Sequence, residues 1–210
     1  EVWKAARGFL EDQVRAGRRA FLYVAVADPH LPYNPPAEAL ARVHPHPYGG
    51  PLRPERTLEQ VALVKRGRLK LGHEDRAYLE ALYDAEVLQM DATLLKVQED
   101  LTRLGIADKT AVAFVGSHGE ELLDHGSIGH GHALYDELTT VPLVLRFPPR
   151  VAAGERPATE LRAELCDLMP TVLALTGVGV PEGVQGESLL PLLAQPSSPT
   201  APRAGIAEHE

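Results

Sequence analysis

Apolar and polar residues recur along the chain in patterns that predict helices and strands in turn. From about residue 73 to residue 104, apolar side chains return every three or four positions, which places them on one stripe of a long helix that ends at Gly105. The same spacing at residues 2–14, closed by Gly17, predicts an earlier helix, and Leu168–Thr176 predicts a late one. We interpret the long stripe as core rather than as a cofactor site.

Continuous apolar runs between the helices predict buried strands. They cover Phe21–Ala27 and, approximately, residues 110–115 and 142–147. Helices that alternate with such strands favour an α/β fold of three layers, with helices on both faces of a mainly parallel sheet. Two polar residues also have predicted local roles: Asp167 as the N-cap of the late helix, and Thr57 as one half of a capping box with Gln60.

Size and composition limit the classes of protein to consider. The 210 residues, 44% of them hydrophobic, suffice for one domain or a large piece of one. A net charge of -8 argues against a nucleic-acid partner, and no apolar run approaches the roughly 20 residues of a transmembrane helix. The single cysteine, Cys166, excludes an internal disulfide framework.

The chain reads as part of a longer one. It begins inside a predicted helix without an initiator methionine, and it ends in what resembles the opening of a strand. We therefore expect a partial catalytic domain over 1–210 that is truncated at both ends. We expect it to associate with the missing remainder of its own chain. Within it we expect a loop-rich insertion at 37–72 and a Pro/Ser-rich surface loop at 195–204.

Histidines mark the candidate chemistry. Four of the nine lie in one segment directly after a predicted strand, at positions 118, 125, 130 and 132, and His30 follows another predicted strand between two prolines. Such crowding at the carboxyl edge of a sheet is typical of an anion or metal site, although a glycine-rich surface loop and a rigid turn remain alternatives. The sequence has no zinc-type cysteine pairs, no phosphate-binding glycine loop and no Gly-x-Ser-x-Gly elbow.

Three segments together resemble the sulfatase family of the alkaline-phosphatase-like superfamily. The first is Asp-Pro-His-Leu-Pro-Tyr at 28–33, similar to the family's Asp-Pro-His-x-Pro-Tyr loop. The second joins Ser-His-Gly-Glu at 117–120, Gly-His-Gly-His-Ala-Leu-Tyr-Asp-Glu at 129–137 and Val-Pro-Leu at 141–143. The third joins Asp-Leu-Met-Pro-Thr at 167–171 and Gly-Glu-Ser-Leu-Leu at 186–190. Their order and spacing cover nearly the whole chain.

The resemblance implies hydrolysis of sulfate monoesters, either of small molecules or of glycans. Sulfatases use a formylglycine and a divalent cation, usually calcium, with magnesium as the other candidate. By position, His30 resembles a histidine that contacts the sulfate or leaving-group oxygen, and His130 or His132 resembles a family lysine or histidine that contacts the sulfate. Ser117 and His118 stand at the family's metal-binding pair. No role is assigned to His125.

Three departures from the family pattern keep other functions open. Ser117 replaces the family's metal-binding aspartate by a neutral hydroxyl, which should weaken a calcium or magnesium site. The Cys/Ser-x-Pro-x-Arg motif that forms formylglycine and the amino-terminal aspartate pair are also missing, and both would lie upstream. We therefore expect this segment alone to be inactive. The alternatives are a catalytically inactive pseudoenzyme and a phosphoester or phosphonoester hydrolase of the same superfamily.

Overall fold

The computed structural model describes residues 2–149, 151, 163–191 and 207, and the chain divides into two compact units. The first unit contains residues 1–109 and 119–131, and the second contains residues 110–118 and 132–210. The predicted loop at 195–204 lies outside the described residues.

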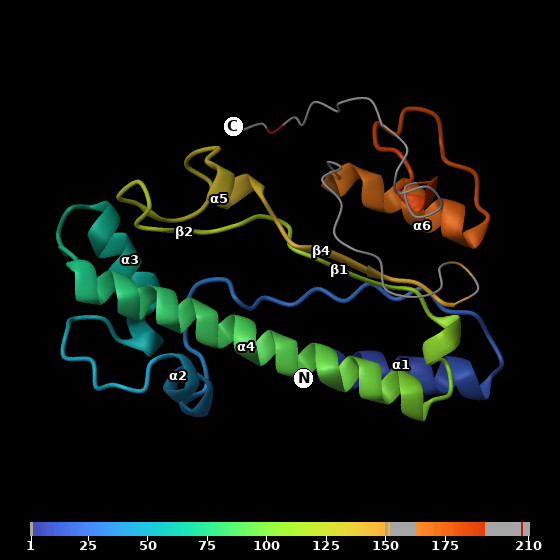
Figure 1. Ribbon diagram of the computed structural model, residues 1–210, viewed down its shortest axis with the longest axis horizontal. Coiled ribbons are helices and arrows are strands. Elements are labelled where there is room, and N and C mark those ends of the chain that lie inside the picture. Colours follow the sequence, from blue (N-terminus) through green and yellow to red (C-terminus); the bar gives the residue numbers. More distant parts are fainter. Residues whose placement is uncertain (1, 150, 152–162, 192–206, 208–210) are drawn as a thin grey trace. The chain divides into compact units, whose positions relative to one another are not determined.

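The first unit is built around the long helix α4, His73–Arg103 (Figure 1). The prediction of this helix is confirmed, and Gly105, with φ +68°, ends it in the left-handed conformation. Only part of the predicted stripe is core, because Leu79 and Leu101 are buried whereas Val87 is 44% exposed. The main core cluster lies at the N-terminal half of α4 and consists of Tyr33, Leu52, Val61, Tyr78, Leu79, Leu82 and Ile128.

Helix α1, Val2–Arg15, packs against the C-terminal half of α4. The indole of Trp3 donates a hydrogen bond of 2.9 Å to the Asp100 carboxylate, which also pairs with Arg103 at 2.6 Å. Gly17, with φ +64°, follows the helix as the sequence predicted.

Residues 37–72 hold short helices joined by proline-rich loops. These are α2 (Ala37–Val43), the 3-10 turn η1 (Pro54–Arg56) and α3 (Thr57–Lys65). The predicted capping box of Thr57 and Gln60 does not form: Gln60 instead accepts the Arg53 N–H and donates to the Pro51 carbonyl. Two hydrogen bonds to the loop backbone, one accepted and one donated, stabilise the Gln60 side chain more than a single capping bond would.

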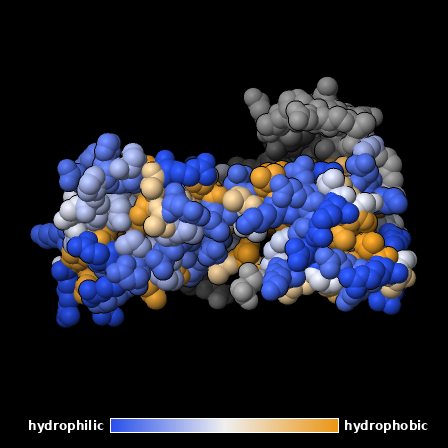
Figure 2. Space-filling model, turned by 90° about the horizontal axis from the view of Figure 1, so that it is seen from below, coloured by the Kyte–Doolittle hydropathy of each residue, from blue (hydrophilic) through white to orange (hydrophobic). Residues whose placement is uncertain are grey.

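The segment Phe21–Ala27 was predicted as a buried strand, and this prediction is wrong for the described structure. It is extended without strand pairing, and Phe21 and Tyr23 are 74% and 81% exposed. A strand requires a hydrogen-bonded neighbour, and no described segment pairs with this one. Apolar side chains reach the surface elsewhere as well, as the orange areas of Figure 2 show.

The described strands form two antiparallel pairs. In the first unit, β2 (Glu121–Leu122) pairs with β3 (Ile128–Gly129). In the second unit, β1 (Val112–Val115) pairs with β4 (Leu143–Arg146), which confirms both predicted strands but not their burial: no residue of either is buried, and Val144 is 59% exposed. The protein is therefore a mixture of helix and sheet, and the parallel sheet expected from the sequence is not present among the described residues.

The second unit continues with the helices α5 (Asp136–Thr139) and α6 (Leu168–Thr176). The helix α6 and its C-terminal stop at Gly177, with φ +76°, agree with the sequence. Two 3-10 turns complete the described elements: η2 (Ala107–Lys109) in the first unit and η3 (Leu165–Asp167) in the second.

Asp167 is the N-cap residue of α6, as the sequence predicts, but it is buried and its side chain makes no capping hydrogen bond to that helix. Its carboxylate accepts the Glu164 N–H at 2.9 Å and the Glu187 N–H at 2.8 Å. It thereby fastens the turn after Gly186, where a Cβ would collide with the Cys166 carbonyl. The N–H groups of two loops compete successfully with the helix terminus for this acceptor.

Candidate active site

The proline-rich loop at residues 28–36 positions His30. The peptide bonds Asp28–Pro29 and Leu31–Pro32 are cis, and the His30 Nδ1 lies 2.8 Å from the Leu31 carbonyl oxygen. Because a carbonyl can only accept, this contact assigns the proton of a neutral ring to Nδ1 and leaves Nε2 as the acceptor.

Tyr33 anchors the same loop in the core. Its ring is fully buried and meets the Tyr83 ring of α4 edge-on at 5.7 Å between centroids. Its hydroxyl donates a hydrogen bond of 2.7 Å to Glu120 Oε2. Burial, followed by the charge of Glu120, raises the pKa of Tyr33 above its usual range, so the phenol stays protonated and acts as the donor.

Glu120 links this loop to the β2–β3 hairpin. Its side chain is only 4% exposed, and its second oxygen lies 2.9 Å from the Nδ1 of His130. The rings of His30 and His130 are 5.0 Å apart between centroids, at an interplanar angle of 64°. Two histidines that are 100 positions apart in the sequence therefore lie side by side, and one carboxylate orients one of them.

Lys65, the last residue of α3, reaches the same place. Gly129 is buried with φ +90°, and a Cβ there would lie 3.4 Å from the Lys65 Nζ and 3.6 Å from Glu120 Oε1. Neither Lys65 nor Glu120 is predicted from the sequence as a site residue. Glu120 belongs to the quoted Ser-His-Gly-Glu segment and was identifiable from it, whereas Lys65 lies in the expected insertion and carries no motif.

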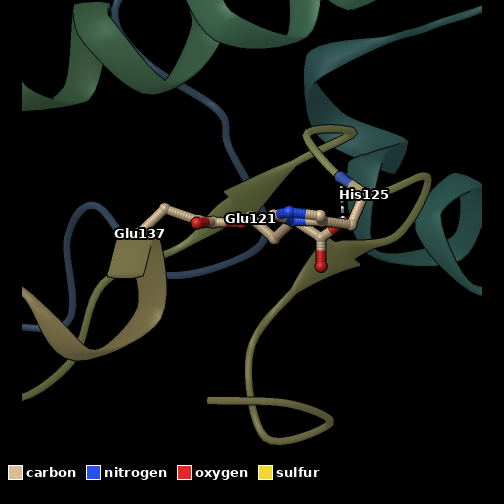
Figure 3. Close-up of side chains that lie close together, drawn as sticks. All are labelled: Glu121, His125 and Glu137. Carbon is tan, nitrogen blue, oxygen red and sulfur yellow. Dashed lines mark hydrogen bonds between the residues drawn. The ribbon is translucent and has the colours of Figure 1, made fainter. Parts of the chain in front are cut away.

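The hairpin that carries His130 is held by two further carboxylates. Glu121 is fully buried, and one of its oxygens accepts the backbone N–H of His125 at 2.9 Å and of Ser127 at 2.8 Å. Figure 3 shows the first of these bonds as a dashed line; Glu137, also drawn, comes from α5 in the second unit. This contact gives His125, which has no predicted role, a structural position in the hairpin.

Asp124 ties the hairpin to the first turns of α4. It accepts the Leu122 N–H at 3.0 Å and the Arg76 guanidinium at 2.7 Å. The backbone hydrogen bond and then the guanidinium lower the pKa of Asp124, so it is ionised over the neutral range. The carboxylates of this hairpin thus fix the backbone that presents His130.

The remaining predicted site residues belong to the second unit. Ser117 and His118 are exposed and follow β1 directly, and Gly116 connects β1 to them by donating its N–H to the Pro142 carbonyl at 3.0 Å. His132 is also exposed and lies in this unit. The metal-binding role of Ser117 and His118 and the sulfate-binding role of His132 stay predictions.

Known proteins match nearly all of this chain. A family model described as Sulfatase matches residues 1–178. The chain belongs to the sulfatase family. It is 29% identical over 186 residues to the uncharacterized sulfatase YidJ of Escherichia coli, which covers 87% of this chain and 36% of that protein. It is 29% identical over 139 residues to an N-acetylglucosamine-6-O-sulfatase of Bacteroides thetaiotaomicron, covering 64% of this chain and 24% of that protein.

A solved structure is also similar to this chain. The phosphonate monoester hydrolase SpPMH of Silicibacter pomeroyi matches with a TM-score of 0.68 and 29% identity, over 94% of this chain and 42% of that one. This sulfatase chain therefore spans between about a quarter and two fifths of the length of these relatives. Among the helices that the structure describes, none has the length and apolar character required to cross a membrane.

Proposed function

We propose that the full-length protein hydrolyses sulfate monoesters, with His30 and His130 as side chains that contact the sulfuryl group or the leaving oxygen. The observation that carries this proposal is their convergence beside Glu120, within one unit and across 100 positions of sequence. Membership of the sulfatase family supports it.

In this proposal the residues of this chain orient the histidine rings and donate a proton to the leaving group. Glu120 accepts from Tyr33 and His130 together, which holds the His130 ring in one orientation. In the proposed reaction, protonated His30 donates its Nε2 proton to the departing oxygen, since its Nδ1 already faces the Leu31 carbonyl. The Lys65 ammonium adds positive charge beside the anionic substrate. The family's formylglycine, which we place upstream of this segment, supplies the nucleophile.

The metal site has a weaker basis in this chain. The family implies a divalent cation, for which Ser117 and His118 are the candidate ligands, with calcium proposed and magnesium as the alternative. A neutral hydroxyl and an imidazole do not by themselves fit a hard cation, which needs several oxygen ligands and carboxylate charge. We therefore assign metal binding to the full-length protein and expect it to be weak at this pair.

The parallel three-layer sheet is also a proposal for the full-length protein. Phe21–Ala27 is extended and presents apolar side chains such as Phe21 and Tyr23 to solvent. We propose that strands from the rest of the protein pair with this segment and cover those side chains. His30 would then follow the carboxyl end of a sheet strand, where ligands bind in open α/β folds.

The match to a phosphonate monoester hydrolase favours a second candidate function, and Ser117 favours an inactive protein. Full-length protein assayed with p-nitrophenyl sulfate and with a phenyl phosphonate monoester distinguishes the three. We expect hydrolysis of the sulfate ester, and a loss of about 100-fold or more in kcat/KM for His30→Ala. His46→Ala, which removes an exposed histidine of the same unit, is the matched control. Turnover of the phosphonate alone would favour the second function, and no turnover of either would favour a pseudoenzyme.

A further inference from the structure

A buried carboxyl group lies on α4 against the loop that carries His30. Glu86 carries an ionisable side chain, yet it is only 5% exposed, because it belongs to the face of α4 that packs in the core, next to the fully buried Ala85. Its Oε1 accepts the backbone N–H of Asn34 at 2.6 Å. Burying an acid costs free energy, so we expect its hydrogen bond to Asn34 to have a structural role.

The composition of the loop explains that role. Asn34 is followed by two prolines, and another proline stands two residues before it, at position 32. Prolines carry no N–H, so this segment cannot form a hydrogen-bonded ladder or helix, and its remaining N–H groups need acceptors from elsewhere. Glu86 provides the acceptor for Asn34 and thereby fixes the end of the loop that is opposite to Asp28.

The second oxygen of Glu86 makes this contact sensitive to protonation. Oε2 is buried and has no hydrogen-bond partner among the described residues. The groups that face it from the loop are the Asp28 carboxylate, which repels it, and the phenol of Tyr33, whose own ionisation Glu86 opposes. Burial and then the charge of Asp28 raise the pKa of Glu86 to about 7, against the opposing effect of the Asn34 hydrogen bond.

We infer that Glu86 is a positioning residue for His30, and that its protonation state sets how firmly the loop at residues 28–34 is held. With the proton on, Glu86 is neutral and tolerates Asp28, two positions before His30. Loss of the proton creates a negative charge at buried Glu86, which strengthens its bond to the Asn34 N–H and at the same time repels the exposed Asp28 carboxylate, so the two ends of the loop are pulled and pushed in opposite directions. The His30 ring then loses its fixed orientation, and substrate binding weakens as the pH rises through neutrality.

A direct test follows the backbone amide of Asn34, the one asparagine of this chain, in full-length protein labelled with [15N]asparagine. Asn34→Ser assigns the peak, because only the backbone of Asn34 takes part in the contact. We expect this peak to titrate with a midpoint near pH 7 and to be flat in Glu86→Gln, which keeps the acceptor and cannot ionise. Asp28→Asn should move the midpoint to lower pH, since it removes the repelling charge.

The amide signal needs no catalytic activity, so it tests the inference even where the proposed function fails. Where sulfate esters are hydrolysed, the wild type should show a rise in KM above pH 7 that Glu86→Gln lacks. Glu99→Gln, an exposed acid on the same helix, should keep the wild-type profile. An Asn34 amide that is flat in the wild type, or that titrates equally in Glu86→Gln, would overturn the inference.

Discussion

Replacement of Glu86 by glutamine should change the pH dependence of folding stability. Folding raises the pKa of this carboxyl from 4.5 to about 7, so the folded state holds the proton more tightly than the unfolded chain does. Below the pKa of the unfolded chain, Glu86 is protonated in both the folded and the unfolded state, so it causes no loss of folding stability. As the pH rises from about 4.5 to about 7, the wild type loses stability, and above that it keeps a constant penalty.

The size of this penalty follows from the shift. At about 1.4 kcal/mol for each pKa unit, the wild type should lose about 3 kcal/mol between pH 4 and pH 8 through this one group. Glutamine cannot ionise, so the difference in unfolding free energy between variant and wild type should move by the same amount in favour of the variant. Any constant effect of the amide cancels in this comparison.

Urea denaturation of the full-length protein at a series of pH values measures the difference. Glu99→Gln serves as the control, because an exposed acid on the same helix should give a difference that does not depend on pH. A Glu86→Gln difference that stays constant within about 0.5 kcal/mol from pH 4 to pH 8 would refute the assignment of a raised pKa to Glu86.

Three further predictions concern other polar contacts. Tyr33→Phe should lower the unfolding free energy by about 1–3 kcal/mol in urea denaturation, since it removes one of the donors to buried Glu120. Ser117→Asp should strengthen calcium binding in calorimetric titration of the full-length protein, and tight binding by the serine form would contradict this. Asp167→Asn should cost about 1–3 kcal/mol by thermal or urea denaturation, because an amide has one acceptor oxygen and leaves either the Glu164 or the Glu187 N–H without its acceptor.

The sequence predicts the helices of this protein well because helical signals are local. The stripe and the terminal glycine of α4 lie within one segment, and both the helix and its end at Gly105 are present. The prediction fails where the competing partner is distant in space. The apolar run Phe21–Ala27 indicates burial, yet a strand also needs a neighbour, and none of the described segments provides one.

The residues of the candidate site also divide into those that the sequence identifies and those that only the fold brings together. Family-like segments identify His30 and His130 from the sequence, and the structure brings these two together. Glu120 lies in one of these segments, whereas Lys65 emerges only from the fold, because its position beside Gly129 depends on how α3 and the hairpin pack. Spacing along the chain contains no information on such a contact, since Lys65 and Gly129 are far apart in sequence and belong to different elements.

Buried acids explain how two loops with little regular structure can hold histidines in place. The His30 loop is rich in proline, and the His130 hairpin pairs over strands of only two residues, so both leave backbone N–H groups that need side-chain acceptors. Glu86 accepts from the first, Glu121 accepts from the second, and Glu120 joins the two through Tyr33 and His130. Because each acid serves donors in a loop, its loss should loosen the backbone. Loss of the exposed His30 ring should act mainly on the chemistry, whereas loss of His130 also removes a donor to buried Glu120. Substitution of His30 therefore tests the proposed activity separately from the stability of this region.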